Sequence, residues 1–365
     1  MRAFFRLQIL FIAFLSFCYS VKSLAQEKNY FFFHPVNYGS ESTFNPISLI
    51  ANGGFDELQS YWRSSALSDI PWKNGEKNVR YNIIAPFPQI NKYGWHEFIF
   101  HEVIPGSFNM DNAQYFPNYT LHLIGGGMEY RKAVEWFDYY GYSVPSVWAI
   151  ISTMGYHYIN EIVENGDYQG PNVDPIADLL IFDPLGILLF SFDGVCRFFS
   201  SEVSLNDWNN QPAISFSPLG IHNTGQNFIM KYPLTASGKT SLLYHFGSFG
   251  ELGLSLKTNN EDALSLGVGV TSRTVETTFN ANGVPRNTIT TGPRAGIYWD
   301  RNNSLMASLI ASDNFRGLVL LNIYPGVFSI KSFSPGFFLL VGKGGTFTLG
   351  ITASFLPVGI SMNKP

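Results

Sequence analysis

The sequence predicts a mainly β protein: a transmembrane antiparallel β-barrel of roughly 10–12 strands, with a helical insertion of two apolar helices before the C-terminal strands. From Pro212 onward, apolar residues alternate with small polar ones, the period of a half-buried strand. The chain is 45% hydrophobic and 16% aromatic but only 14% charged, against about a quarter charged in soluble domains. Beyond the N-terminus no run approaches the roughly 20 apolar residues of a spanning helix, so a lipid face spread over alternate strand residues fits best.

Residues 1–25 predict a cleaved secretory signal peptide. Arg2 and Arg6 precede an apolar core at 7–17, and Ser23-Leu24-Ala25 places small residues before Gln26. A lipoprotein signal ending at Cys18 is the alternative, but the bulky Phe17 stands where a small residue is expected. We therefore expect export and residence in the cell outer membrane.

Cleavage would leave Cys196 as the one cysteine, so no intramolecular disulfide is expected. A reactive thiol is one interpretation of Cys196. Its neighbours Val195, Phe198 and Phe199 favour a small buried apolar side chain instead.

Residues 26–117 predict an irregular segment with short strands, rich in Asn, Gly, Pro and aromatic residues. Within it, 95–102 is strand-like and carries His96, Glu97, His101 and Glu102. These are metal-ligating residue types, but in a strand the two histidines would point to opposite faces, so no metal site is predicted there. Residues 118–142 predict a strand and aromatic segment, in which the glycines at 125–127 indicate a close backbone approach.

Residues 143–205 predict the helical insertion, with two apolar helices. In the first, His157, Glu161 and Glu164 recur at i, i+4 and i+7 and share one face. In the second, Asp174 before Pro175 indicates a helix cap, Asp178 follows, and Pro184 after Asp183 should kink or end the helix. We expect the two segments to pack on one another, plug a lumen or lie at one membrane surface.

Residues 206–365 predict the barrel strands. Leu252, Leu254 and Leu256 alternate with small polar residues, as do 264–271 and 346–355. Turn signals separate the runs at 258–261, 300–303, 324–326 and 342–345, and 274–291 predicts a longer loop. A soluble β-sandwich would show the same alternation, but aromatic residues at strand ends and a glycine- and serine-rich polar face favour a barrel.

The stretch 125–190 resembles a family of uncharacterised bacterial outer-membrane proteins defined by a domain of unknown function. The resemblance rests on Tyr130, Gly141-Tyr142, Tyr156, Tyr158, Glu161, Pro171, Asp178, Pro184 and Gly186. It covers about a fifth of the chain. His157 stands where that family tends to have an acid, and Phe190 where a Gly-Glu end is usual. The resemblance implies an outer-membrane architecture and no established chemistry.

The leading functional hypothesis is an outer-membrane barrel of structural, binding or transport type, whose helices plug or cap the lumen. Its polar cluster would be Glu161, Glu164, Asp174, Asp178 and Asp183, bonded to barrel-wall donors such as Arg273, Arg294, Arg301 and Arg316. We expect contact with outer-membrane lipid, an unidentified small-molecule or lipid ligand at most, and no cofactor. The net charge of −4 argues against a nucleic-acid partner.

The alternative is a membrane-embedded hydrolase or acyltransferase that modifies lipid or lipopolysaccharide. His157 would be the general base, oriented by Glu161 or an aspartate. Ser152 is the hydroxyl nearby in the chain, but no G-x-S-x-G elbow is present. A metal held by His157, Glu161 and Glu164 is a further hypothesis, although H-x-x-x-E lacks the H-E-x-x-H pattern. Because the spacing of these three residues matches no known metal-binding motif closely, we predict no bound metal.

Overall fold

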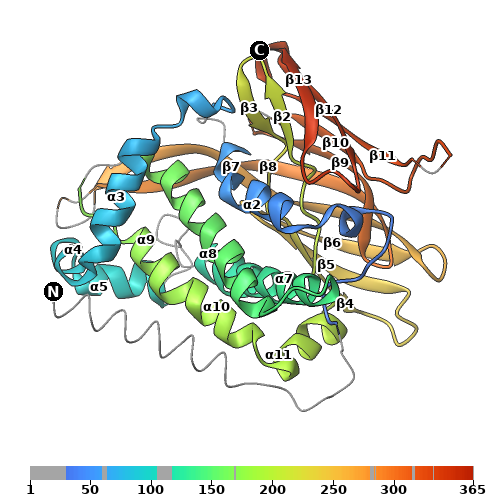
Figure 1. Ribbon diagram of the computed structural model, residues 1–365, viewed down its shortest axis with the longest axis horizontal. Coiled ribbons are helices and arrows are strands. Elements are labelled where there is room, and N and C mark those ends of the chain that lie inside the picture. The colour runs from blue at the N-terminus through green and yellow to red at the C-terminus, as the bar shows by residue number, and fades with distance from the viewer. Residues whose placement is uncertain are drawn as a thin grey trace.

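A layer of helices covers one face of a large β-sheet in the computed structural model of the chain (Figure 1). The structure describes residues 30–59, 64–104, 117–167, 170–279, 283, 285–314, 317–331 and 333–364. The predicted signal peptide lies outside these residues. The helical layer comes first in the chain and the sheet second.

The helical layer runs from residue 40 to residue 202. Its principal helices are α2 (Pro46–Gly54), α3 (Trp72–Ile84), α4 (Pro86–Tyr93), α5 (Trp95–Phe98), α7 (Gly127–Tyr139), α8 (Pro145–Glu164), α9 (Asp174–Ala177), α10 (Asp183–Phe190) and α11 (Asp193–Arg197). Wider π-helical turns join several of them: η4 (Ile99–Val103), η6 (Asn118–Gly126), η8 (Asp178–Phe182) and η9 (Phe198–Glu202). Short 3-10 segments precede the larger helices: η1 (Ser40–Thr43), η2 (Asp56–Gln59) and η3 (Leu67–Asp69).

The predicted short strands in 26–117 and the strand in 118–142 are wrong, because the described parts of both segments are helical. The apolar residues near Trp95 show why. Phe98 is buried, and Ile99 and Val103 pack beside it at spacings that place them on one helical face. Glu97 and His101 then pair one turn apart, 2.8 Å from nitrogen to oxygen.

The prediction that 143–205 is helical is confirmed, but this stretch is part of a much larger helical layer and not an insertion of two helices. α8 packs against α2, α3 and α7, whereas α10 packs against α7 and η6. α7 and η6 therefore provide the principal contacts of α10. Pro184 lies in the first turn of α10, immediately after the π-helical η8, so the chain continues through this point in helical form.

The second half of the chain forms one mixed sheet of 13 strands. The strands are β1 (Asn206–Asp207), β2 (Ala213–Phe216), β3 (Leu219–His222), β4 (Phe228–Pro233), β5 (Thr240–Phe246), β6 (Phe249–Lys257), β7 (Asp262–Phe279), β8 (Pro285–Arg301), β9 (Ser304–Ser312), β10 (Val319–Ile323), β11 (Pro335–Val341), β12 (Phe347–Ala353) and β13 (Gly359–Lys364). From β4 to β13 each strand pairs antiparallel with the next, and β13 pairs parallel with β2.

The predicted closed, purely antiparallel barrel is not what the strand order shows, because the order has two ends, β1 and β3. The ladder is interrupted at 208–212 and at 223–227. There, amide side chains bond main-chain groups: Asn210 to the carbonyl of Thr224, and Asn223 to that of Gln211. Two main-chain bonds still join the two segments, from Trp208 to Asn227 at 2.7 Å and from Asn210 to Gly225 at 3.2 Å.

The predicted turns between strands are confirmed. The turn at 258–261 joins β6 to β7, that at 300–303 joins β8 to β9, that at 324–326 follows β10, and that at 342–345 joins β11 to β12. The predicted longer loop at 274–291 is wrong. β7 extends to Phe279 and β8 begins at Pro285, so most of that segment belongs to the longest hairpin of the sheet. Its threonine-rich sequence suits extended backbone.

The two layers share an apolar core in which α7, α10 and α11 meet β4 and β5. Phe32, Met128, Phe190, Phe228 and Phe246 form it. Cys196 belongs to this core and is fully buried, as predicted for a small apolar side chain. At Gly125 an added Cβ would lie 2.5 Å from the Phe228 ring, so helix and strand approach closely there.

Among the described residues, no single helix is long and apolar enough to cross a bilayer. One bent pair, Asp174–Phe190 with Asp193–Glu202, meets the criteria of length and composition, with an angle of 83° between its two parts.

Candidate functional site

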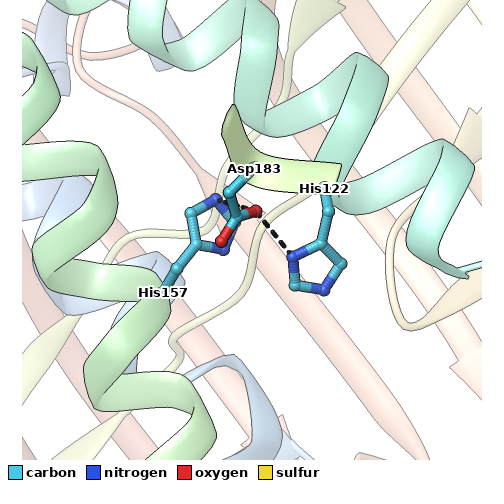
Figure 2. A group of neighbouring side chains, drawn as sticks. All are labelled: His122, His157 and Asp183. Carbon is cyan, nitrogen blue, oxygen red and sulfur yellow. Dashed lines mark hydrogen bonds and ion pairs between the residues drawn. The ribbon is translucent and has the colours of Figure 1, made fainter. Parts of the chain in front are cut away.

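The candidate site is a buried group of His122, His157 and Asp183 inside the helical layer. His122 comes from η6, His157 from α8 and Asp183 from the first residue of α10. Figure 2 shows the Asp183 carboxylate between the two imidazole rings. Its Oδ1 atom lies 2.9 Å from His122 Nδ1 and 3.2 Å from His157 Nε2.

The backbone around this group has two π-helical segments, η6 and η8, which are uncommon and frequently occur at functional sites. η6 carries His122, and η8 ends immediately before Asp183. Each π turn changes the rotation of the following residues about the helix axis, so these segments set the directions in which His122 and Asp183 project.

Glycines let the three segments come together. A Cβ on Gly126 would lie 2.8 Å from His157 Nε2. A Cβ on Gly186 would lie 2.8 and 2.9 Å from the carbonyl oxygens of Leu123 and His122. The predicted close approach at the glycine triplet is therefore confirmed: it admits α8 on one side and α10 on the other.

Several polar atoms of this site are buried without a hydrogen-bond partner. They are His157 Nε2, Asp183 Oδ2, Asp178 Oδ1 and Thr153 Oγ1. His157 Nε2 lies close to Asp183 Oδ1 but outside hydrogen-bonding geometry. Unpartnered buried polar atoms are uncommon in folded proteins and call for an explanation in terms of an ion, a ligand or strain.

Asp178 extends the site on the other side of His122, with its Oδ2 atom 3.5 Å from His122 Nε2. His122 thus lies between two aspartates, one near each ring nitrogen. Its side chain is 12% exposed, whereas those of His157 and Asp183 are 3% and 0% exposed, so the site reaches the surface on the His122 side.

Burial controls the protonation of this region. It lowers the pKa of His157 to about 3, so the ring is neutral at pH 7. Burial also raises the pKa of Glu161 and Asp178 well above their ordinary values, and neighbouring carboxylates, Asp174 first among them, raise both further. A hydrogen bond joins the Glu161 and Asp178 side chains. This geometry fits two carboxyl groups that share a proton.

The predicted site residues divide into two groups. His157, Asp178 and Asp183 belong to the site just described. The remaining three, Glu161, Glu164 and Asp174, form a second group whose ligand-type oxygens all lie within 4.8 Å of one another. Glu161 accepts a hydrogen bond from Asn165 at 3.0 Å. His157 forms an ion pair with Asp183. Of the two predicted orienting partners, Glu161 or an aspartate, the structure therefore places the aspartate beside the ring.

His122 is the residue of the candidate site that the sequence analysis did not predict. It lies in a run that was predicted to be a strand, in which a histidine between leucines carries no signal. The glycine triplet beginning three residues later was the available clue, because it predicted that another part of the chain comes close to this segment.

The other predicted contacts are not formed. The expected donors from the sheet pair with acids of the sheet: Arg294 with Glu251, Arg301 with Asp262 and Arg273 with Asp313. Arg316 lies outside the described residues. Ser152 donates its hydroxyl to the carbonyl of Trp148 in its own helix, at 2.9 Å, and so is not directed toward His157.

A separate pocket of about 420 Å³ lies where η2 and η3 face the sheet. Polar side chains from both layers line it, including Gln59, His222, Thr271, Arg294 and Asn314. Its size is that of a small-molecule site.

Comparisons with protein-family models, curated proteins and solved structures found no match to this chain. The resemblance to a family of uncharacterised outer-membrane proteins therefore stays a prediction, and the class of protein must be argued from its own surface and site.

Proposed function

We propose that the protein is an outer-membrane β-structure of structural, binding or transport type, with its sheet in contact with lipid and its helical layer as a plug. The observation that carries this proposal is one row of apolar residues, in direct register across nine consecutive strands from β5 to β13. The row is Leu242, Leu254, Leu266, Ile297, Leu309, Leu321, Leu339, Leu349 and Met362. Seven of these side chains are between 43% and 65% exposed, and the other two are half-buried.

A parallel row lies on each side of it. One is Leu252, Val268, Ala295, Ala311, Val319, Val341 and Phe347. The other is Leu256, Leu264, Trp299, Ala307, Ile323, Phe337, Ile351 and Ile360. We call the three rows the apolar belt.

One row on the opposite face of the same strands is polar. Residues between the rows are Ser255, Ser265, Tyr298, Ser308 and Asn322, which are in register on β6 to β10 and are all buried. The neighbouring row on this covered face carries the buried apolar side chains Leu243, Ile310 and Leu320, so the covered face is mixed. The exposed face carries the apolar belt, whereas a soluble sheet exposes its polar face. A polar interior with an apolar exterior is the arrangement of an outer-membrane barrel.

The extent of the belt favours lipid over a protein partner. Monomeric soluble proteins rarely expose apolar patches larger than a few hundred Å², whereas this belt crosses nine strands. Along β7 the belt runs from Leu264 to Val268, about 13 Å at roughly 3.3 Å per residue. The exposed Val270 extends the same apolar face to about 20 Å, against an apolar band of about 25 Å in such barrels.

Heat-modifiable gel mobility and membrane fractionation test this proposal. Mature protein should sediment with the outer membrane, require detergent for extraction and run faster unboiled than boiled. Leu266→Lys, in the middle of the belt, should destabilise the folded membrane form by about 2–4 kcal/mol. Asn260→Lys adds the same charge in an exposed turn outside the belt and should have little effect.

A different result would contradict the proposal. If the mature chain is recovered as a soluble monomer without detergent, the belt does not face lipid. Equal stability of the Leu266→Lys and Asn260→Lys variants would lead to the same conclusion.

The alternative, a lipid-modifying hydrolase or acyltransferase, is favoured by one observation, the 3.2 Å approach of His157 Nε2 to Asp183. An imidazole beside a carboxylate is part of a general base. Replacing His157 by Ala and comparing membrane lipid composition tests it, and unchanged lipid would remove the enzyme hypothesis.

A further inference from the structure

The two imidazoles and the carboxylate of the candidate site form a compact set of three ligand-type side chains. We propose that His122 Nδ1, His157 Nε2 and Asp183 bind one divalent first-row transition-metal ion and leave at least one coordination position open for water or another ligand. This inference does not depend on where the sheet resides, because all three residues belong to the helical layer.

The spacing of the ligand atoms fits a shared ion. Zinc binds imidazole nitrogen and carboxylate oxygen at about 2.0–2.2 Å, so two ligands of one ion lie roughly 3–3.5 Å apart. Asp183 Oδ1 is 2.9 Å from His122 Nδ1 and 3.2 Å from His157 Nε2. All three ligand atoms lie within 4.8 Å of one another, on segments that three different parts of the helical layer provide.

The unpartnered atoms supply an independent reason. His157 Nε2 and Asp183 Oδ2 have no hydrogen-bond partner. Both residues are only 2% exposed. An imidazole nitrogen that carries no proton presents a lone pair, and a neighbouring cation would satisfy it. A bound ion therefore accounts for atoms that the protein leaves unsatisfied.

Charge balance points the same way. Among the ion pairs of the described residues, those of Asp178 and Asp183 are with histidines, and none joins either of them to a lysine or arginine. Buried carboxylates are normally paired or coordinated to metal. A divalent cation would compensate the charge of Asp183 where no lysine or arginine of the described residues does so.

Asp178 fits the role of a positioning residue for His122. Metal-bound histidines usually donate their second ring N–H to a carboxylate, which sets the tautomer and the ring orientation. Asp178 Oδ2 lies 3.5 Å from His122 Nε2, the nitrogen that faces away from Asp183. Two histidines and one carboxylate with open positions are the ligand set of catalytic zinc sites and of non-haem iron oxygenases.

Zinc titration of the purified, folded full chain tests the proposal. Protein is stripped with a chelator, dialysed, and titrated with Zn²⁺ against a chromophoric competitor, with Co²⁺ absorption as a second readout of nitrogen and oxygen ligation. We expect one equivalent of tightly bound zinc per chain. His122→Ala, His157→Ala and Asp183→Asn should each reduce the affinity by at least about 100-fold, and Asp178→Asn by about 10–100-fold.

His96→Ala is the matched control, because this imidazole is 80% exposed on the surface of the same layer and should leave zinc binding unchanged. Far-UV circular dichroism checks each variant for folding. His157→Gln replaces His157→Ala if the alanine variant loses its helical spectrum, since it keeps a polar side chain of similar length.

Two results would overturn the proposal. One is a folded wild-type chain that binds no more zinc than the His122→Ala/His157→Ala double variant. The other requires two unchanged zinc affinities in folded variants. One is that of Asp183→Asn, and the second is that of either His157→Gln or Asp178→Asn. Neither result bears on the membrane proposal, whose readouts are fractionation and gel mobility.

Discussion

Asp56 shows how a single buried carboxyl couples stability to pH. Its side chain in η2 accepts hydrogen bonds from the main-chain nitrogen of Gln226, at 2.8 Å, and from Gln59, at 2.6 Å. Burial nevertheless raises its pKa from 3.8 to about 7, because the two hydrogen bonds do not offset the loss of water. The folded protein therefore holds a proton on Asp56 at pH values where the unfolded chain has lost it.

This difference predicts a decrease in stability as pH rises. Between 3.8 and about 7 the native state binds more protons than the unfolded state, so the free energy of unfolding falls with a slope of up to about 1.4 kcal/mol per pH unit. Above the folded-state pKa the contribution of Asp56 is constant. Denaturant midpoints measured across this window should fall in the wild type. Asp56→Asn should make that decrease shallower without abolishing it, because burial also raises the pKa of Glu41 and Glu129.

Asp69→Asn is the matched control for Asp56, because Asp69 is exposed in the neighbouring η3 segment. It should keep the pH dependence of the wild type. The assignment to Asp56 would be incorrect if Asp56→Asn and Asp69→Asn gave the same pH profile.

At the scale of elements, close crossings between helices hold the candidate site together. α10 meets η6 at Gly186, where an added methyl group would overlap two main-chain carbonyl oxygens. Backbone cannot move aside as a flexible side chain can, so the crossing requires glycine. The π-helical turns η6 and η8 adjoin this crossing, and Asp183 and His122 are brought together beside it.

Gly186→Ala should therefore destabilise the protein by about 1–3 kcal/mol, because the inserted methyl group forces α10 away from η6. Gly155→Ala provides the comparison within the same layer. Gly155 lies inside α8 with nothing within 4 Å of an added Cβ, so alanine there should stabilise the helix by about 0.5–1 kcal/mol. Denaturant unfolding measures both. Equal effects of the two substitutions would show that the Gly186 crossing is not tightly packed.

At the scale of the whole molecule, a buried group of charges joins the helical layer to the sheet. Lys132 of α7 is fully buried and forms ion pairs with Glu41 of η1, at 2.5 Å, and with Asp207 of β1. One turn away on α7, Glu129 accepts hydrogen bonds from Tyr156, Asn209 and Gln226. One face of α7 is thus bonded to the interrupted part of the sheet, where β1 gives way to 208–212.

Lys132→Met should destabilise the whole fold by about 3–5 kcal/mol, because it leaves two buried carboxylates without their cation. Adding Glu41→Gln and Asp207→Asn to Lys132→Met should recover most of that loss. Arg80→Met is the control: its pair with Glu76 has side chains 57% and 44% exposed, and its removal should change stability by less than about 1 kcal/mol. If the Lys132→Met and Arg80→Met variants unfolded at the same denaturant midpoint, the coupling between layers would have another source.

Much of the sheet could be predicted from local pattern. Alternation at 252–257, 264–271 and 346–355 corresponds to β6, the first half of β7 and β12, and the predicted turns separate strands as expected. A period of two is a property of neighbouring residues, so it survives without knowledge of the fold. The N-terminal helices were not predicted, because the prediction for that segment relied on its amino-acid composition. The helical spacing of residues such as Phe98 and Val103 was the more informative pattern.

The candidate site could be predicted only in part. Residue types and their spacing within one segment predicted His157 and Asp183. The packing of η6, α8 and α10 brings in His122 and makes Asp183 the partner that both histidines share. Asp174, which was predicted to cap its helix, is half-buried and begins that helix without capping it, whereas Asp178 and Asp183 are buried. Proline beside aspartate is informative about helix geometry but carries no information about burial.

The sequence by itself determined the alternation of the strands, the turns between them and the helical character of 143–205, because each depends on residues close together in the chain. Tertiary structure alone decided the order and ends of the sheet, the register that aligns nine apolar residues in one row, and the meeting of His122, His157 and Asp183. These features depend on contacts between residues far apart in the chain, and such contacts leave no period or spacing that can be detected locally.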